Sequence, residues 1–300
     1  MAASGLTPAT AVIAGIALAA ALSMPLTALE QSATVTKSFT LSAVDGRRTL
    51  VVNNVMGEIE IAAGTGSIVT LILKETFKAK SAEEMTRARQ EVALEVTEHP
   101  GRLELVQGGP WRCRDGRHDG ESRSSRGDCC CNHTDRDYEV RFDWTLTVPR
   151  ELDLEVENVN DGAIRITGTV GRLEVGHVND DITLENVAGQ VDARTVNGAL
   201  RVSFAASPAG NCRFGTVNGD IDLAFPKGLG AELSFATLNG EVYTDFPFEM
   251  AKLPATSARS TAGGRHHHEL GKTTAATIGG GGIGLACNTV NGDIYIRERS

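Results

Sequence analysis

Four cysteines and a histidine gather in one polar, Gly- and Arg-rich segment. Cys113 precedes Cys129, Cys130 and Cys131, and His133 follows them. Thiolate and imidazole groups bind zinc, so Cys113, Cys129, Cys131 and His133 are candidate ligands of a Cys₃His site. The paired C-x-x-C spacing of standard zinc modules is missing, and cysteines outside the cytoplasm usually form disulfides. We therefore expect two disulfide bridges within this segment, with no metal and no cofactor.

A second candidate metal site is the tract His266 to His268. Histidine-rich tracts bind transition metals. This one lies in a Gly-, Ala- and Thr-rich stretch without a nearby cysteine. That composition favours a solvated loop over a metal site.

Acidic residues recur at one position of a repeated sequence pattern, two residues after an asparagine. They would form an acidic stripe, interrupted by Ala199, on one face of the molecule: Asp181, Asp220, Glu241 and Asp293. A second row beside it would hold Arg165, Thr183, Arg201, Asp222, Tyr243 and Tyr295. One interpretation is a solvated face that keeps the protein soluble. The other is a carboxylate row that binds cations, or a basic or glycan surface.

Catalytic signatures are missing from the sequence. It has no G-x-S-x-G elbow, P-loop, H-E-x-x-H pair or dinucleotide-binding glycine pattern. Polysaccharide lyases of the parallel β-helix class place carboxylates and arginines on an outer sheet, and Asp220, Asp222 and Arg201 would be the minimal set here. No long loops frame a cleft beside these positions, so we expect a protein that is not an enzyme.

The elements that must position these side chains follow from the repeated pattern. Each copy has five apolar positions around an asparagine-containing turn, and alternation on both sides of the turn is typical of strands with one buried face. Copies spaced by about 20 residues indicate a repeat architecture. The sequence therefore predicts an all-β fold, a single-chain β-solenoid of two-strand coils. The copies span 50–61, 154–166, 173–184, 191–202, 212–223, 233–244 and 285–296.

Stacking of these coils would bring like residues together. The turn asparagines would form one column, which we interpret as structural because asparagine tolerates positive φ and stacked amides hydrogen-bond along a column. Its members are Asn179, Asn197, Asn218, Asn239 and Asn291. A column beside it would hold Thr195, Thr216, Thr237 and Thr289. Cys212 and Cys287 fall on core positions, so we expect buried thiols there.

The N-terminal residues 1–28 are interpreted as a signal peptide. The apolar run from Ala11 to Leu22 is too short to span a bilayer comfortably, and small residues follow it, with cleavage expected after Ala28. The leader lacks Lys and Arg, so a retained anchor or a misassigned start is the alternative. We expect an exported mature chain without a membrane span, in the periplasm, on the cell surface or outside the cell.

Two regions follow the leader. Residues 38–150 are expected to form an N-terminal β-rich region with a first strand after Ser38, the first coil, one short helix and a Cys-rich insertion at 107–137. The sequence Ser81-Ala-Glu-Glu84 is a capping box, which predicts a helix from Ala82 to Glu91. Because residues 68–148 depart from the coil pattern, we expect them to cover the open edge of the first coil. Residues 151–300 hold the main coils and a His/Gly-rich insertion at 246–282.

The string Trp144-Thr-Leu-Thr-Val-Pro149, the Leu-x-Leu-x-Val that follows it and the repeated V-N-G-D-I resemble the bacterial "putative adhesin" family of toastrack-like β-solenoids. The resemblance covers about Leu152 to Asp245 and Leu285 to Ile296, and more loosely Leu50 to Val148. It implies a single-chain β-solenoid, an exported or envelope setting, and a binding or scaffolding role without catalytic residues. The Cys-rich and His-rich insertions depart from that family.

These observations lead to one hypothesis and two alternatives. The chain is expected to be an exported, non-catalytic β-solenoid that binds an unknown surface, glycan or protein. The net charge of −9 and the absence of clustered Lys and Arg exclude a nucleic-acid partner. The alternatives are a β-helix carbohydrate-active enzyme and a metal- or redox-sensing envelope protein built on the Cys cluster.

Overall fold

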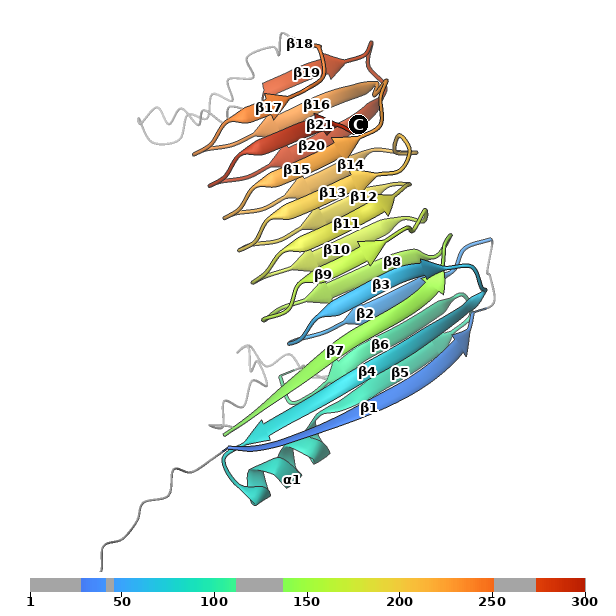
Figure 1. Ribbon diagram of the computed structural model, residues 1–300, viewed down its shortest axis with the longest axis vertical. Helices are drawn as coiled ribbons and strands as arrows, with labels where there is room; N and C mark the ends of the chain where they lie inside the picture. The colour runs from blue at the N-terminus through green and yellow to red at the C-terminus, as the bar shows by residue number, and fades with distance from the viewer. Residues whose placement is uncertain (1–27, 42–45, 112–136, 251–273, 300) are drawn as a thin grey trace, which may run out of the picture.

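A computed structural model describes residues 28–41, 46–111, 137–250 and 274–299. They form two large sheets that face each other along a tall stack, with one short helix at the lower end (Figure 1). One sheet has ten strands and the other has eleven, and neither closes into a barrel. The predicted all-β fold is confirmed.

The middle of the stack consists of coils that each contribute one strand to either sheet. Equivalent residues of successive coils pair in parallel, so that Leu173 lies between Leu154 and Val191 in one sheet. In the other sheet, Ile182 lies between Ile164 and Leu200. The strands are β8 (Asp153–Asn158), β9 (Ile164–Thr167), β10 (Leu173–His177), β11 (Ile182–Val187), β12 (Val191–Arg194), β13 (Leu200–Phe204), β14 (Cys212–Gly215) and β15 (Ile221–Phe225).

Four of the five apolar positions in each middle coil are buried, which explains the alternation in the sequence. The fifth, the residue before the turn asparagine, lies at the corner and is partly exposed. Val196 and Val217 are each 39% exposed, and Leu238 in the terminal coil is 76% exposed. The phenylalanines fill the space that the short aliphatic residues leave, with the rings of Phe204 and Phe225 stacked at 4.8 Å. Burial of this apolar interior is the main stabilising contribution to the stack.

The order of coils in the stack differs from their order in the chain at the C-terminal end. The final coil lies between the coil of β14–β15 and the coil of β16–β17, so that Leu285 pairs with both Cys212 and Leu233. Ile294 likewise pairs with both Ile221 and Val242. The strands concerned are β16 (Ala231–Ala236), β17 (Val242–Thr244), β20 (Ile283–Asn288) and β21 (Ile294–Glu298).

The N-terminal region continues the stack, contrary to the expectation that residues 68–148 leave the coil pattern. The first coil, β2 (Thr49–Asn53) and β3 (Ile59–Gly64), stacks on β8 and β9. Below it, β6 (Arg102–Gly108) and β7 (Tyr138–Pro149) pair in parallel with β2 and β3. These two strands form a further rung, and the long segment between them hid its spacing in the sequence.

Antiparallel strands close the lower end, as expected for a covered edge. β4 (Ile68–Ala79) pairs with β7, β1 (Leu29–Thr40) pairs with β4, and β5 (Ala93–His99) pairs with β6. The first strand thus begins at Leu29 and not after Ser38, because twelve residues of β1 pair along the whole of β4. The predicted helix is confirmed as α1 (Ala82–Glu91), with the Ser81 hydroxyl accepting from the Glu84 N–H.

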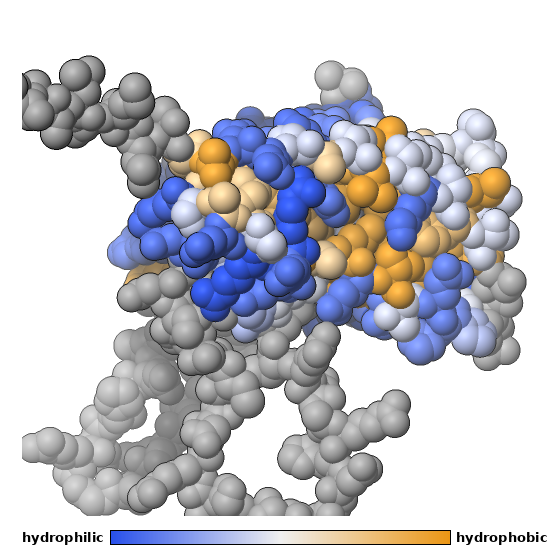
Figure 2. Space-filling model, turned by 90° about the horizontal axis from the view of Figure 1, so that it is seen from below, coloured by the Kyte–Doolittle hydropathy of each residue, from blue (hydrophilic) through white to orange (hydrophobic). Residues whose placement is uncertain are grey.

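Apolar side chains remain partly exposed at this lower end. Figure 2 shows a hydrophobic area there between hydrophilic margins. The residues that pack against the core from this end while only partly buried include Val35, Leu41, Leu94 and Val96. The last strands of the two sheets, β1 and β5, have no further rung beyond them in the part of the chain that is described.

Both predicted insertions are shorter than expected. Gln107 is fully buried on β6, where its amide oxygen accepts from the Val55 N–H at 2.8 Å, so the polar segment begins after it. Phe246 is also buried, and residues on both sides of the second segment are paired strands. These are β18 (Phe248–Met250) and β19 (Thr274–Ile278), which pair with each other, while β19 also pairs with β16.

Several sequence-based expectations fall outside the described residues. Cys113, Cys129, Cys130, Cys131 and His133, the tract 266–268 and the leader 1–27 are among them. The division into regions 38–150 and 151–300 stays a prediction. Across the described ranges, the structure has no helix that is long and apolar enough to span a membrane.

Candidate functional site

The turn asparagines form a continuous column along one corner of the stack, which we call the Asn ladder. Along the ladder, the side-chain Nδ2 of one asparagine donates to the Oδ1 of the asparagine in the preceding coil of the stack, in five bonds of 2.7–3.2 Å. The order along the stack is Asn160, Asn179, Asn197, Asn218, Asn291 and Asn239. The expected backbone reason is wrong, because none of these residues has positive φ. Their amides serve the ladder, and Asn160 belongs to it although the extra residue in its turn hid it in the sequence.

A second polar column runs inside the same corner, at the residue before each partly exposed apolar position. Thr216 donates from its hydroxyl to the Gly198 carbonyl at 2.9 Å, and Thr289 donates to Gly219 at 3.1 Å. Such buried hydroxyls need a partner, and the turn of the neighbouring coil provides one. We call this set the inner column; its members are Asn54, Asn158, His177, Thr195, Thr216, Thr289 and Thr237.

His177 is the ionisable member of the inner column. Its Nδ1 accepts from the Val178 and Asn179 N–H groups at 2.7 and 3.1 Å, so its Nε2 carries the proton and donates to the Gly162 carbonyl at 2.9 Å. Burial lowers the pKa of this imidazole, although the Gly162 carbonyl and the charges of Asp180 and Asp181 oppose that shift. These hydrogen bonds therefore require the neutral form of His177.

The acidic stripe is engaged by the backbone of neighbouring coils. Asp220 accepts from the Asp293 N–H at 2.9 Å, and Asp293 accepts from the Glu241 N–H at 2.8 Å. Asp181 accepts from the Ala199 N–H at 2.7 Å in the same way. Burial raises the pKa of Asp181, but that N–H and the Arg201 guanidinium outweigh it and lower the pKa overall. Asp181, Asp220 and Asp293 thus each close the turn of the next coil as well as adding charge to the surface.

Two tyrosines stand beside the C-terminal part of this stripe. The rings of Tyr243 and Tyr295 stack at 5.1 Å with an interplanar angle of 8°. The Tyr243 hydroxyl donates to Glu241 at 2.6 Å, which raises the pKa of Tyr243 to about 12, and the Tyr295 hydroxyl donates to Asp293 at 3.1 Å. The Arg297 guanidinium lies 4.7 Å from the other face of Tyr295. This exposed surface combines aromatic rings with carboxylates held in fixed positions, and we call it the Tyr–acid surface.

The three residues considered for a lyase-like site do not act on one another. Arg201 pairs with Asp181 at 2.6 Å, whereas Asp222 pairs with Arg297 at 2.9 Å. Asp220 is bound by a backbone N–H of the final coil. Arg201 and Asp222 are register neighbours, yet their charges are used by different partners.

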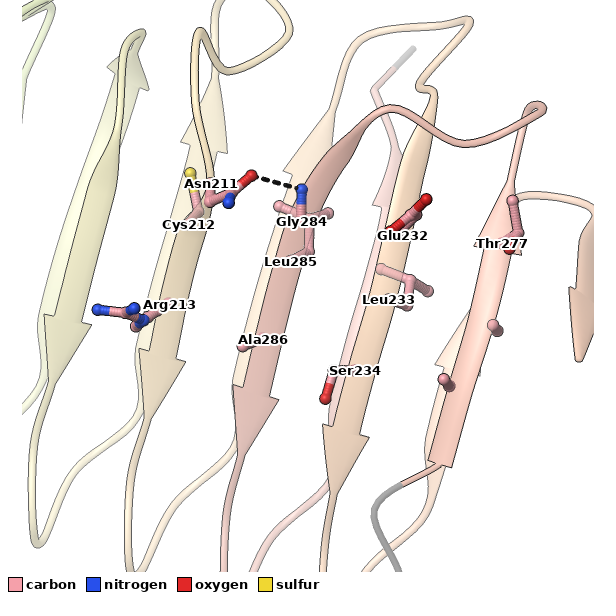
Figure 3. A pocket seen from close by; sticks show the side chains of 12 residues that line it. Asn211, Cys212, Arg213, Glu232, Leu233, Ser234, Thr277, Gly284, Leu285 and Ala286 are labelled. Carbon is pink, nitrogen blue, oxygen red and sulfur yellow. Dashed lines mark hydrogen bonds between the residues drawn. The ribbon is translucent and has the colours of Figure 1, made fainter. Parts of the chain in front are cut away.

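A hollow of about 550 Å³ lies on the outer face of the other sheet, across β14, β20, β16 and β19 (Figure 3). Gly284, Ala286 and Ser234 lie among its lining residues, with Arg213 on one side and Glu232 and Thr277 toward the other. The Asn211 amide oxygen accepts from the Gly284 N–H at 2.9 Å at its upper end. The hollow exists because small residues stand where the lower strands of this sheet carry long charged side chains. Glu232 and Arg213 lie on opposite sides of it.

The remaining cysteines match the expectation of buried thiols. Cys212 and Cys287 are each 1% exposed and unbridged. Burial raises the pKa of Cys212 to about 11 and that of Cys287 to about 12, which keeps both thiols protonated and unreactive. Within the described residues, no group of three or more His, Cys, Asp or Glu side chains is placed to hold a metal ion.

No protein-family model and no curated protein matches the chain. Among solved structures, it is similar to a "putative cell adhesion protein" from Clostridium sporogenes (14% identity, TM-score 0.39, covering 90% of this chain and 100% of that one). It is also similar to a "putative adhesin" from Bacteroides fragilis (9%, TM-score 0.36, covering 89% and 97%) and a "putative lipid binding protein" from Parabacteroides distasonis (10%, TM-score 0.26, covering 89% and 97%). The adhesin names agree with the family resemblance.

Sequence reasoning found the columns of the acidic stripe and of the asparagines but missed two features. The inner column was visible only as threonines, because Asn158 and His177 occupy the same position with different residue types. The Asp222–Arg297 pair was also missed, since it depends on the final coil lying next to β15. The inner column could have been found from position alone, because each of its members directly precedes the apolar residue at the corner.

Proposed function

We propose that this chain is an exported, non-catalytic β-solenoid that binds a surface, glycan or protein through the Tyr–acid surface. One observation carries the proposal: Tyr243, which is 46% exposed, stacks on Tyr295 while Glu241 and Asp293 hold the two hydroxyls. Exposed aromatic rings beside fixed hydrogen-bond acceptors are the chemistry that recognises sugars and protein side chains. The apolar run in residues 11–22 and the cysteine-rich composition of 113–131 support export.

The stack also suits a role in presenting such a surface. All its coils share one apolar interior, and the side-chain columns connect each coil to its neighbours. A rigid element positions binding groups more accurately than a loop does. The two tyrosines lie on β17 and β21 and the two acids on the turns that precede these strands, near the end of the stack farthest from α1 (Figure 1).

The test is binding of the purified full-length chain to an array of glycans and to intact bacterial cell envelopes. Tyr243→Ala and Tyr295→Ala are expected to weaken binding at least tenfold. Thr183→Ala, in the same row but in a middle coil, is the matched control and should bind like the wild type. Equal binding by all four proteins would contradict the proposal.

The absence of catalysis is tested separately with polysaccharide and peptide substrates. We expect no turnover by the wild-type chain. Turnover that Asp220→Asn or Asp222→Asn abolishes would instead establish the carbohydrate-active enzyme considered from the sequence.

A further inference from the structure

The terminal coil is formed by β16, the turn Thr237–Glu241 and β17, and β17 is the last strand of the ten-stranded sheet. β17 pairs with β21 on one side, and across the described residues no strand pairs with its other side. A free strand edge is a template for another strand. β17 has only three residues, so backbone pairing alone would give such a partner little affinity or selectivity.

The side-chain columns supply the missing selectivity, because within the described residues each column ends at this coil. In the Asn ladder, Asn239 donates to Asn291, which leaves the Asn239 Oδ1 as the acceptor for a further amide. In the inner column, Thr237 donates to the Gly292 carbonyl, and the Gly240 carbonyl is the equivalent acceptor for a further hydroxyl. The Glu241 carboxylate accepts from the Tyr243 hydroxyl, and it stands at the position from which Asp293 and Asp220 each accept an N–H of the next coil.

The backbone hydrogen bonds between coils also end at the terminal coil. In interior coils, the N–H after the turn asparagine donates onward, as from Gly219 to the Asn291 carbonyl and from Gly292 to the Asn239 carbonyl. Ile221 likewise donates onward to the Asp293 carbonyl. The equivalent groups of the terminal coil are the N–H groups of Gly240 and Val242, which face away from β21.

The exposed apolar groups mark the same edge. Leu238 is 76% exposed, twice the value of the equivalent valines, because no coil of the described residues covers it. The face of Tyr243 opposite Tyr295 has no stacking partner among the described residues.

We propose that the edge of β17 binds an extended polypeptide segment of another chain, which adds in parallel as one more rung. The segment must carry an Asn-Gly turn followed by alternating apolar residues, because those residues supply the amide, N–H and side-chain groups that the terminal coil lacks. The final coil provides the precedent: it docks on β14–β15 and β16–β17 through the same columns although it comes from a distant part of the sequence. Strand addition of this kind takes affinity from the backbone and specificity from side-chain positions.

The experiment uses the full-length chain and a fluorescent peptide of residues 289–299, which holds the turn and β21 of the final coil without a cysteine. Fluorescence anisotropy should report saturable binding. Thr244→Pro removes an outward N–H at an edge position where proline is tolerated, and it should weaken binding at least tenfold. Thr244→Ala, which loses the same hydroxyl but keeps the N–H, should bind like the wild type.

A second arm uses changes in the peptide, so the result does not depend on how well a variant folds. Replacing Asn291 by Ala removes the amide that would donate to Asn239. Methylating the backbone nitrogen at Tyr295 removes the N–H that would donate to the Val242 carbonyl, as the Asp245 N–H donates to Ile296. Each change should abolish binding to wild-type protein. Tyr295→Ala in the protein should leave its affinity for the unaltered peptide unchanged, while it weakens binding of the surface, glycan or protein ligand of the proposed function. This difference separates the two proposals. No binding of the 289–299 peptide, or equal binding of its altered forms, would overturn the inference, and binding of a glycan alone at this edge would do the same.

Discussion

The coils from Leu154 to Phe225 follow one another in the stack as they do in the chain, whereas the last two coils exchange places. Both regions nevertheless use the same columns: the Asn ladder passes from Asn218 to Asn291 and on to Asn239 with bonds as short as those between Asn197 and Asn218. The comparison teaches that a coil is placed by side-chain complementarity and not by its position in the sequence.

Removal of the final coil would break this comparison most severely. A chain that stops before residue 283 leaves β17 without its parallel neighbour and β16 with only the antiparallel β19. We expect residues 231–244 to lose their amide protection in hydrogen–deuterium exchange, while residues 173–202 keep theirs. Retained protection across 231–244 would mean that this coil stands on its own or docks directly on β14–β15.

Loss of a large core side chain tests whether the middle coils depend on shared packing. Phe204 stacks on Phe225 and meets the edge of Phe214, so Phe204→Ala should lower the free energy of unfolding by about 3–5 kcal/mol. Leu238→Ala, at the exposed corner position of the terminal coil, should change it by less than about 0.5 kcal/mol. Denaturant titration measures both, and similar losses for the two variants would contradict the assigned burial.

The inner column differs between coils in its response to pH. The folded pKa of His177 is lowered, so the imidazole is neutral in both states above its unfolded pKa of about 6.5 and contributes no pH dependence there. As the pH falls below that value, the unfolded chain takes up a proton that the folded chain does not. Stability should then fall by up to about 1.4 kcal/mol per pH unit.

His177→Thr places in this coil the residue that Thr195 supplies in the next one. The variant should lose this slope between pH 7.5 and 5, measured by denaturant titration at each pH. Asp181, whose pKa is lowered, loses its contribution only at lower pH, as the carboxylate becomes protonated. An unchanged slope in the His177→Thr variant would show that other groups dominate this window.

The Asn ladder should show a smaller difference between an interior and a terminal member. Asn218→Ala removes two side-chain bonds, at 2.8 and 2.7 Å, whereas Asn239→Ala removes one at 2.7 Å. We expect losses of about 1–2 and about 0.5–1 kcal/mol in the free energy of unfolding. A terminal variant that is as destabilised as the interior one would mean that the bonds along the ladder contribute unequally.

The sequence predicted a column wherever the same kind of side chain recurs at one position relative to the turn in successive copies. Alternation around Val217 predicted two strands and a corner, and the spacing of the copies predicted parallel stacking. The stacking order could not be predicted, since copies with the same columns are interchangeable in sequence. The rung of β6 and β7 was missed because residues 109–137 separate its strands, and the inner column was missed where His177 replaces threonine.

The Tyr–acid surface was predictable in part for the same reason. Tyr243 and Tyr295 share one position of the pattern, so their proximity followed from the register. The partners of Asp220, Asp222 and Arg201 depended on the stacking order and on the choice among nearby charges. The periodicity of the sequence therefore predicted which residues share a face of the stack. It did not predict which charged residues on that face pair with each other.

A disulfide cross-link tests the stacking order most directly. Asp222 and Tyr295 are register partners, whereas Asp222 and Tyr243 are separated by the final coil. Adjacent strands lie about 4.8 Å apart, within the Cα separation that a disulfide spans, and alternate strands do not. The variants carry Asp222→Cys with either Tyr295→Cys or Tyr243→Cys. In their background, serine replaces four other cysteines: Cys113, Cys129, Cys130 and Cys131. Mass spectrometry under non-reducing conditions should find the 222–295 cross-link and not the 222–243 cross-link; the reverse result would contradict the insertion of the final coil.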